Sequence, residues 1–153
     1  MRTALLVLLL TACSKVKPPT LPASANTDRV TIRIAALNDF HGALYETPQR
    51  KQPEKALGGL PWLVAAMDSL RAEHPELVVL DGGDLFQGSW PVNASRGMGS
   101  VDAYNLVGVD AAAVGNHEFD YGGNPDGSGH PLRAALETAA AHAEFAWLSA
   151  NVH

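Results

Sequence analysis

Blocks of apolar residues recur along this chain, and their lengths and composition predict four strands. Residues 30–37 are rich in β-branched side chains and predict a strand that ends at a polar Asn-Asp turn. Residues 77–80 form a short, wholly apolar run, which is typical of a strand covered on both faces. Two further apolar stretches, at 111–114 and 145–149, predict the third and fourth strands.

Helical patterns fall between these strands. A helix is predicted after the glycine pair at 58–59, with Pro61 near its start, because apolar residues then recur at helical spacing: Leu60, Leu63, Val64, Met67 and Leu70. Residues 100–107 and the alanine-rich stretch 132–143 predict two more helices, whereas residues 42–56 carry glycine, proline and many charges and predict a surface loop. The order β-α-β-α-β-α-β predicts an α/β fold with a largely parallel sheet.

The first 28 residues differ in composition from the rest. An apolar stretch at 4–10 is too short to span a bilayer, and the small residues after it lead to Cys13, as in a bacterial lipobox. Residues 14–28 are rich in proline, serine and threonine and predict a flexible linker. We therefore expect a lipoprotein signal peptide over 1–13, lipidation and membrane attachment at Cys13, and an exported protein that is periplasmic or anchored to the outer membrane. An ordinary secretory signal with a chance cysteine is the alternative.

Length and composition then limit the remaining possibilities. The 153 residues suffice for one domain at most, which we place at 29–153, and 46% apolar with 18% charged residues is ordinary globular composition. The net charge of −5 and the absence of a basic run disfavour nucleic acid as a structural partner. The single cysteine excludes an internal disulfide, and its position at 13 excludes thiol chemistry in the folded domain.

Polar side chains directly follow three of the predicted strands: Asp39 with His41, then Asp84, then Asn116 with His117. Because the carboxyl ends of strands in an open α/β sheet line one edge, we expect these segments to meet. Asp39 and His41 alternate along a chain expected to be extended, so both side chains should point the same way, and both suit a divalent transition metal. Each cluster alone is a weak signal, but together they predict a metal site at this edge.

Four further positions near these clusters have an expected role. Asp120 lies three residues after His117 and is placed to accept a hydrogen bond from the imidazole, which would fix its tautomer. Between them, Glu118 is expected to satisfy backbone donors, and Gly115 to let the chain turn after its strand. Trp90 follows the Gly-Gly-Asp turn and either packs in the core or borders the substrate.

Three motifs carry a family resemblance: Asn38-Asp39-Phe40-His41-Gly42, Asp81-Gly82-Gly83-Asp84 and Gly115-Asn116-His117-Glu118-Phe119-Asp120. Together they resemble those of the calcineurin-like metallophosphoesterases. Within that family they are similar to the bacterial 5′-nucleotidase, UDP-sugar hydrolase and 2′,3′-cyclic-nucleotide phosphodiesterase branch. The resemblance covers about residues 30–151 and implies the N-terminal part of a metallophosphoesterase domain.

The resemblance also implies a site with two divalent metal ions of the zinc, manganese, cobalt or iron type. The implied ligands are Asp39 and His41 for the first ion, Asp84 as the bridge and Asn116 for the second. His117 would be the catalytic histidine that is not a ligand, with Asp120 as its partner. The implied reaction is the hydrolysis of nucleotides or related phosphate esters outside the cytoplasm, with the metal ions lowering the pKa of a shared water.

The 153 residues lack other parts that the family has, namely a histidine pair, a Gly-His-x-His-like segment and a C-terminal nucleotide-binding domain. Four ligands do not fill two coordination shells of about four to six donors each. The alternative is therefore a truncated, catalytically incomplete lipoprotein with at most weak metal or partner binding. A third interpretation keeps the fold and changes the substrate to a sulfur ester.

Overall fold

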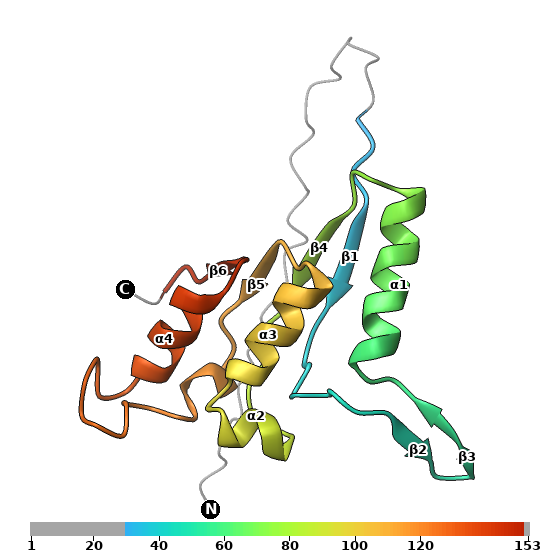
Figure 1. The fold of residues 1–153 in the computed structure, drawn as a ribbon. Helices are drawn as coiled ribbons and strands as arrows, with labels where there is room; N and C mark the ends of the chain where they lie inside the picture. Colours follow the sequence, from blue (N-terminus) through green and yellow to red (C-terminus); the bar gives the residue numbers. More distant parts are fainter. Residues whose placement is uncertain (1–29, 152–153) are drawn as a thin grey trace, which may run out of the picture. The chain divides into compact units, whose positions relative to one another are not determined.

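Four short strands form a parallel sheet in the spatial order β1-β4-β5-β6 (Figure 1). The computed structural model describes residues 30–151, so Cys13, the expected signal peptide and the expected linker lie outside the described residues. The strands are β1 (Ile34–Leu37), β4 (Val78–Asp81), β5 (Ala111–Ala113) and β6 (Ala146–Leu148). Leu37 pairs with Asp81, and Asp81 with Ala112, so the carboxyl ends of three strands lie at one edge. The predicted α/β fold with a parallel sheet is confirmed.

Helices connect the strands in the predicted order: α1 (Leu60–Glu73), α3 (Met98–Val107) and α4 (Ala134–His142). α1 begins after Gly59 with a proline in its first turn, where a missing N–H costs no hydrogen bond. α3 ends where Gly108 adopts a left-handed conformation. Two short helical segments have no counterpart in the sequence pattern: α2 (Trp90–Ala94) and η1 (His117–Phe119). No helix between residues 30 and 151 combines the length and hydrophobicity needed to cross a bilayer.

The segment expected to be a surface loop at 42–56 contains a β-hairpin instead. Its strands, β2 (Thr47–Gln49) and β3 (Gln52–Leu57), are antiparallel, with Thr47 opposite Leu57. Nearly all the described side chains of the hairpin are exposed. Because neither face is buried, no alternation of apolar and polar residues marks these strands in the sequence.

The three longer helices pack on one face of the sheet. The core joins Met67 of α1, Tyr104 of α3 and Ala139 of α4 to sheet residues of that face: Ala35, Leu37, Val79, Ala112 and Trp147. The register places a second set on the opposite face, and every member is apolar: Ile34, Ala36, Val78, Leu80, Ala111, Ala113, Ala146 and Leu148. Ile34 is 57% exposed and Leu148 56%. The expectation that residues 77–80 are covered on both faces is therefore confirmed for one face only.

Candidate metal centre

The loops that follow β1 and β4 run side by side beyond the ends of the strands. The backbone N–H of Asp39 donates to the carbonyl of Gly83 (3.0 Å), and that of His41 donates to the carbonyl of Asp84 (3.1 Å). Phe40, between the two predicted ligands, is only 9% exposed and packs against the ring of Tyr104, with a centroid distance of 5.0 Å. The buried ring and the backbone hydrogen bonds together hold Asp39 and His41 at this edge of the sheet.

The backbone around the first two predicted ligands is not extended, so the reason given for their common direction is wrong. Asp39 has a φ of 51° and His41 a φ of 45°, both in the left-handed region. Their side chains are neighbours nevertheless, because Oδ1 of Asp39 lies 3.9 Å from Nε2 of His41.

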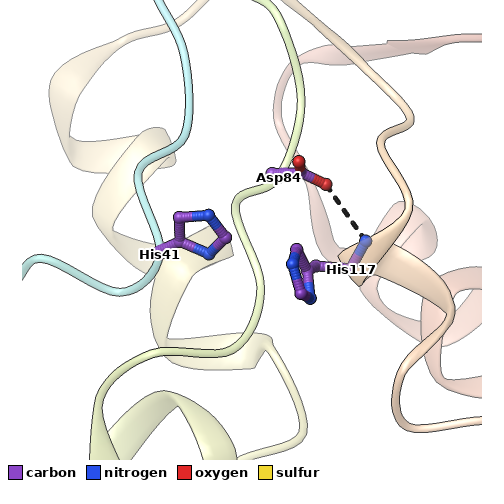
Figure 2. A group of neighbouring side chains, drawn as sticks. All are labelled: His41, Asp84 and His117. Atoms are coloured by element: carbon purple, nitrogen blue, oxygen red, sulfur yellow. Dashed lines mark hydrogen bonds between the residues drawn. The ribbon is translucent and has the colours of Figure 1, made fainter.

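A compact group of possible ligands forms where three loops meet (Figure 2). His41, Asp84 and His117 each offer one ligand atom, and these atoms all lie within 4.8 Å of one another. The backbone N–H of His117 donates to Oδ1 of Asp84 (3.0 Å), and the two imidazole rings meet edge to face with centroids 4.9 Å apart. All three residues are partly buried. Segments from after β1, β4 and β5 thus converge on one point.

The orientation of each imidazole is set by a hydrogen bond on its Nδ1 atom. Nδ1 of His41 lies 3.2 Å from the carbonyl oxygen of Phe86, which can only accept, so Nδ1 is the donor and Nε2 is the ring nitrogen left to bind a ligand. Nδ1 of His117 lies 2.6 Å from Oδ2 of Asp120, as the sequence analysis expects. This hydrogen bond is the main cause that raises the pKa of His117 above its usual value.

Two other predicted ligands, Asp39 and Asn116, are neighbours of this group in the chain. The Asp39 side chain is 57% exposed and accepts a hydrogen bond from the amide of Asn38. Asn116 is exposed and directly precedes η1, between Gly115 and His117 in the chain. Their roles as ligands remain predictions.

Gly115 has a different function from the turn that the sequence predicts. Its φ is not positive, so the backbone there does not require glycine. A Cβ atom at this position would lie 2.6 Å from the backbone nitrogen of Asp84 and closer still to the Asp84 carboxylate. Glycine is needed because the loops after β4 and β5 approach each other closely.

Asp81 ends β4 and shapes the turn that leads to Asp84, a role that the sequence analysis missed. It is 6% exposed; its Oδ1 accepts from the N–H of Gly83 (2.7 Å) and its Oδ2 from the hydroxyl of Tyr104 (2.8 Å). Burial raises the pKa of Asp81, and the two hydrogen bonds oppose that rise. The sequence signal that could have revealed this role is the position of Asp81, a carboxylate directly after the apolar run 77–80.

Trp90 does not pack in the core, since it is 81% exposed. It follows Gly88 and Ser89, which lie close to His41 and Gly42. A Cβ on Gly88 would collide with the His41 carbonyl, and a Cβ on Gly42 would collide with the Ser89 hydroxyl. The expectation that Trp90 packs in the core is therefore wrong, and its contact with a substrate stays a prediction.

The donor set suits a divalent first-row metal. Imidazole nitrogens together with carboxylate oxygens bind zinc, manganese, cobalt and iron. The hydrogen bond between Nδ1 of His41 and the Phe86 carbonyl leaves Nε2 as the ring nitrogen that can bind a metal, and such a hydrogen bond is the usual support of a histidine ligand. The described residues therefore fit a metal ion at this position.

Comparison with known proteins places this arrangement among phosphoesterases. The profile of the family described as calcineurin-like phosphoesterase matches residues 32–151. A snake venom 5′-nucleotidase from Gloydius brevicauda is 32% identical over 124 residues, which are 79% of this chain and 20% of that protein. A solved structure of a 5′-nucleotidase precursor from Thermus thermophilus has a TM-score of 0.65 at 30% identity, over 80% of this chain and 22% of that one.

The chain spans about a fifth of the length of the curated 5′-nucleotidases that it matches. A sulfate thiohydrolase from Thermus thermophilus has a TM-score of 0.61 at 19% identity, over 80% of this chain and 30% of that one. At this identity the similarity concerns the fold alone.

Proposed function

This chain belongs to the calcineurin-like phosphoesterase family, and on that premise we propose that it forms part of a two-metal hydrolase acting on nucleotides or related phosphate esters. The observation that carries the proposal is the convergence of two predicted ligands, His41 and Asp84, with the predicted catalytic acid His117: one side-chain atom of each lies within 4.8 Å of the other two. The similarity of this chain to 5′-nucleotidases, which extends over most of the chain's length, supports nucleotides as the substrate class.

In this proposal four residues hold two divalent ions: Asp39, His41, Asp84 and Asn116. Bound ions of this kind lower the pKa of a coordinated water and neutralise charge on the phosphoryl oxygens. The chain supplies the orientation: the Phe86 carbonyl fixes the His41 ring, and the His117 N–H fixes the Asp84 carboxylate.

His117 acts in the proposal as an acid and not as a ligand. Asp120 accepts the hydrogen bond from Nδ1, so only Nε2 is free to face the substrate. Because the pKa of His117 is raised, Nε2 keeps its proton at higher pH than an isolated histidine would. That proton can be donated to the leaving oxygen or to a phosphoryl oxygen.

The proposal is tested with the full-length gene product by measuring phosphate release from a nucleotide in the presence of Mn²⁺. Asp84→Ala removes the bridging carboxylate, and we expect activity to fall by more than about 100-fold, beyond the loss typical of residues that only support ligands. Asp68→Ala, an exposed carboxylate of α1, is the matched control and should leave activity unchanged. Undiminished turnover by Asp84→Ala would refute the proposed site.

The alternative function is a catalytically incomplete lipoprotein, because the described candidate ligands are too few for two shells of about four to six donors each. Calorimetric titration of the purified chain with Mn²⁺ or Zn²⁺ distinguishes the two-metal hydrolase from the incomplete lipoprotein. Two tight sites support a competent centre, whereas none or one weak site supports the incomplete protein.

We further propose that the protein is exported and held at a membrane by a lipid on Cys13. The support is the sequence of residues 1–13, in which a short apolar stretch leads to the cysteine. Replacement Cys13→Ala should move the protein from the membrane fraction to the soluble fraction, and an unchanged membrane fraction would contradict the anchor.

A further inference from the structure

Glu118 is a charged side chain with no exposed surface, directly beside the candidate metal centre. Its carboxylate accepts four backbone hydrogen bonds. Oε2 accepts from the N–H groups of Asp84 (3.0 Å) and Gly115 (2.6 Å), and Oε1 from those of Leu85 (2.7 Å) and Phe86 (3.2 Å). Burying a carboxylate is costly unless its oxygens are hydrogen-bonded, and here both oxygens have two donors each.

The four donors come from two different loops. Residues 84–86 follow β4, and Gly115 follows β5, so one carboxylate ties the loop that carries Asp84 to the loop that carries Asn116 and His117. A further hydrogen bond runs in the opposite direction, from the His117 N–H in the loop after β5 to Oδ1 of Asp84 in the loop after β4. Asp84 is thus held by two hydrogen bonds: its backbone N–H donates to Glu118, and its carboxylate accepts from the backbone N–H of His117.

The backbone at Asp84 needs such support. Its φ is 60°, and a left-handed conformation at a residue other than glycine is unfavourable and persists only where the surroundings impose it. The N–H groups of three successive residues, 84 to 86, converge on one carboxylate, in the manner of backbone concavities that bind anions. Here the anion is a side chain of the protein, so these donors serve the site's geometry and do not contact phosphate.

We propose that Glu118 is a positioning residue that sets the spacing between Asp84 and His117, and thereby the affinity of the centre for its metal ions. The inference rests on the proposed two-metal function and adds to it a residue that touches neither metal nor substrate. A merely structural Glu118 would contribute to stability and leave the metal affinity of the folded protein unchanged.

The test is Glu118→Gln in the full-length gene product. Glutamine has the same size but replaces one oxygen by an NH₂ group. Since each oxygen of Glu118 accepts two N–H groups, the NH₂ of glutamine faces two N–H donors in either orientation of the amide. We expect Mn²⁺ affinity, measured by calorimetry on metal-free protein, to fall about 10- to 100-fold, with a similar fall in kcat for a nucleotide and little change in KM.

Two further variants complete the design. Glu118→Asp keeps two acceptor oxygens and the charge, so it should recover part of the Mn²⁺ affinity, and it carries the test if Glu118→Gln does not fold. Glu54→Gln, at an exposed position of β3, is the matched control and should bind Mn²⁺ as the wild type does.

The outcomes separate this inference from the proposed function. A folded Glu118→Gln protein with wild-type Mn²⁺ affinity overturns the positioning role and leaves the proposed function intact. Wild-type protein that neither binds Mn²⁺ nor hydrolyses nucleotides overturns both. A loss of affinity at Glu118→Gln with recovery at Glu118→Asp supports the positioning role.

Discussion

At the scale of residues, the candidate centre concentrates unfavourable backbone conformations. Among the described residues, five other than glycine have a positive φ, and three of them are predicted ligands: Asp39, His41 and Asp84. Conformations of this kind persist where surrounding hydrogen bonds impose them, and they cluster at functional sites. The backbone hydrogen bonds from Asp39 and His41 to the loop after β4 provide that constraint here.

A residue-scale prediction concerns the pair of His117 and Asp120. Asp120→Asn keeps an oxygen near Nδ1 but removes the negative charge, so the pKa of His117 should fall. NMR titration of the imidazole in metal-free protein measures the change directly. A titration of His117 that is the same in both proteins would show that Asp120 does not control its proton.

The same pair predicts a pH dependence of stability. The pKa of His117 is raised in the folded state, so the protonated ring stabilises the fold. This contribution to stability is fully present below the unfolded-state pKa of 6.5 and is lost as the pH rises through the folded-state pKa. The stability difference between the wild type and Asp120→Asn should therefore be largest below pH 6.5 and shrink at higher pH. Urea denaturation of the metal-free proteins at several pH values checks this.

At the scale of elements, α3 is linked to the carboxyl end of β4 through one buried hydroxyl. Tyr104 is 1% exposed, and its hydroxyl donates to Oδ2 of Asp81. Its ring also packs near Phe40 and Phe145, with centroids 5.0 and 6.0 Å away. One side chain of a helix thus joins the core to the turn that leads into the candidate metal centre.

The corresponding prediction is that Tyr104→Phe destabilises the fold by about 1–3 kcal/mol, because it leaves a buried oxygen of Asp81 without its donor. Urea denaturation measures the loss. Tyr45→Phe is the control, since Tyr45 is 68% exposed and its replacement should change stability by less than about 0.5 kcal/mol. Equal stability of the two variants would show that the Tyr104 hydroxyl contributes nothing.

At the scale of the whole molecule, the sheet is covered by its long helices on one face only. Parallel sheets normally have both faces covered. In the part of the chain that the structure describes, the second face consists entirely of apolar side chains, and Ile34 and Leu148 are more than half exposed. A face of this kind binds apolar dyes and promotes association.

We therefore expect the purified 153-residue chain to bind an apolar dye and to self-associate. The double variant Ile34→Thr and Leu148→Thr keeps strand-forming residues and should reduce both dye fluorescence and the sedimentation coefficient. Leu106→Thr is the control, because Leu106 is 66% exposed on α3, which packs on the other face. If Leu106→Thr lowered both quantities as much as the double variant, the apolar face of the sheet would not be the cause of dye binding and self-association.

The sequence alone was sufficient for the order of the main elements and for the three polar clusters at strand ends. Apolar periodicity reports which residues are buried, and the topology of a parallel sheet then brings the clusters after β1, β4 and β5 to one edge. The sequence did not predict the hairpin at 47–57, because its strands are exposed and show no apolar periodicity.

Only the tertiary structure decided how the side chains of the centre are held. The left-handed backbone of Asp39 and His41, the close approach that requires Gly115 and the four donors to Glu118 all arise from contacts between loops. The loops that Glu118 joins are more than thirty residues apart in the chain. Local sequence patterns do not encode such contacts, because these form only once the strands are in register and their ends lie side by side.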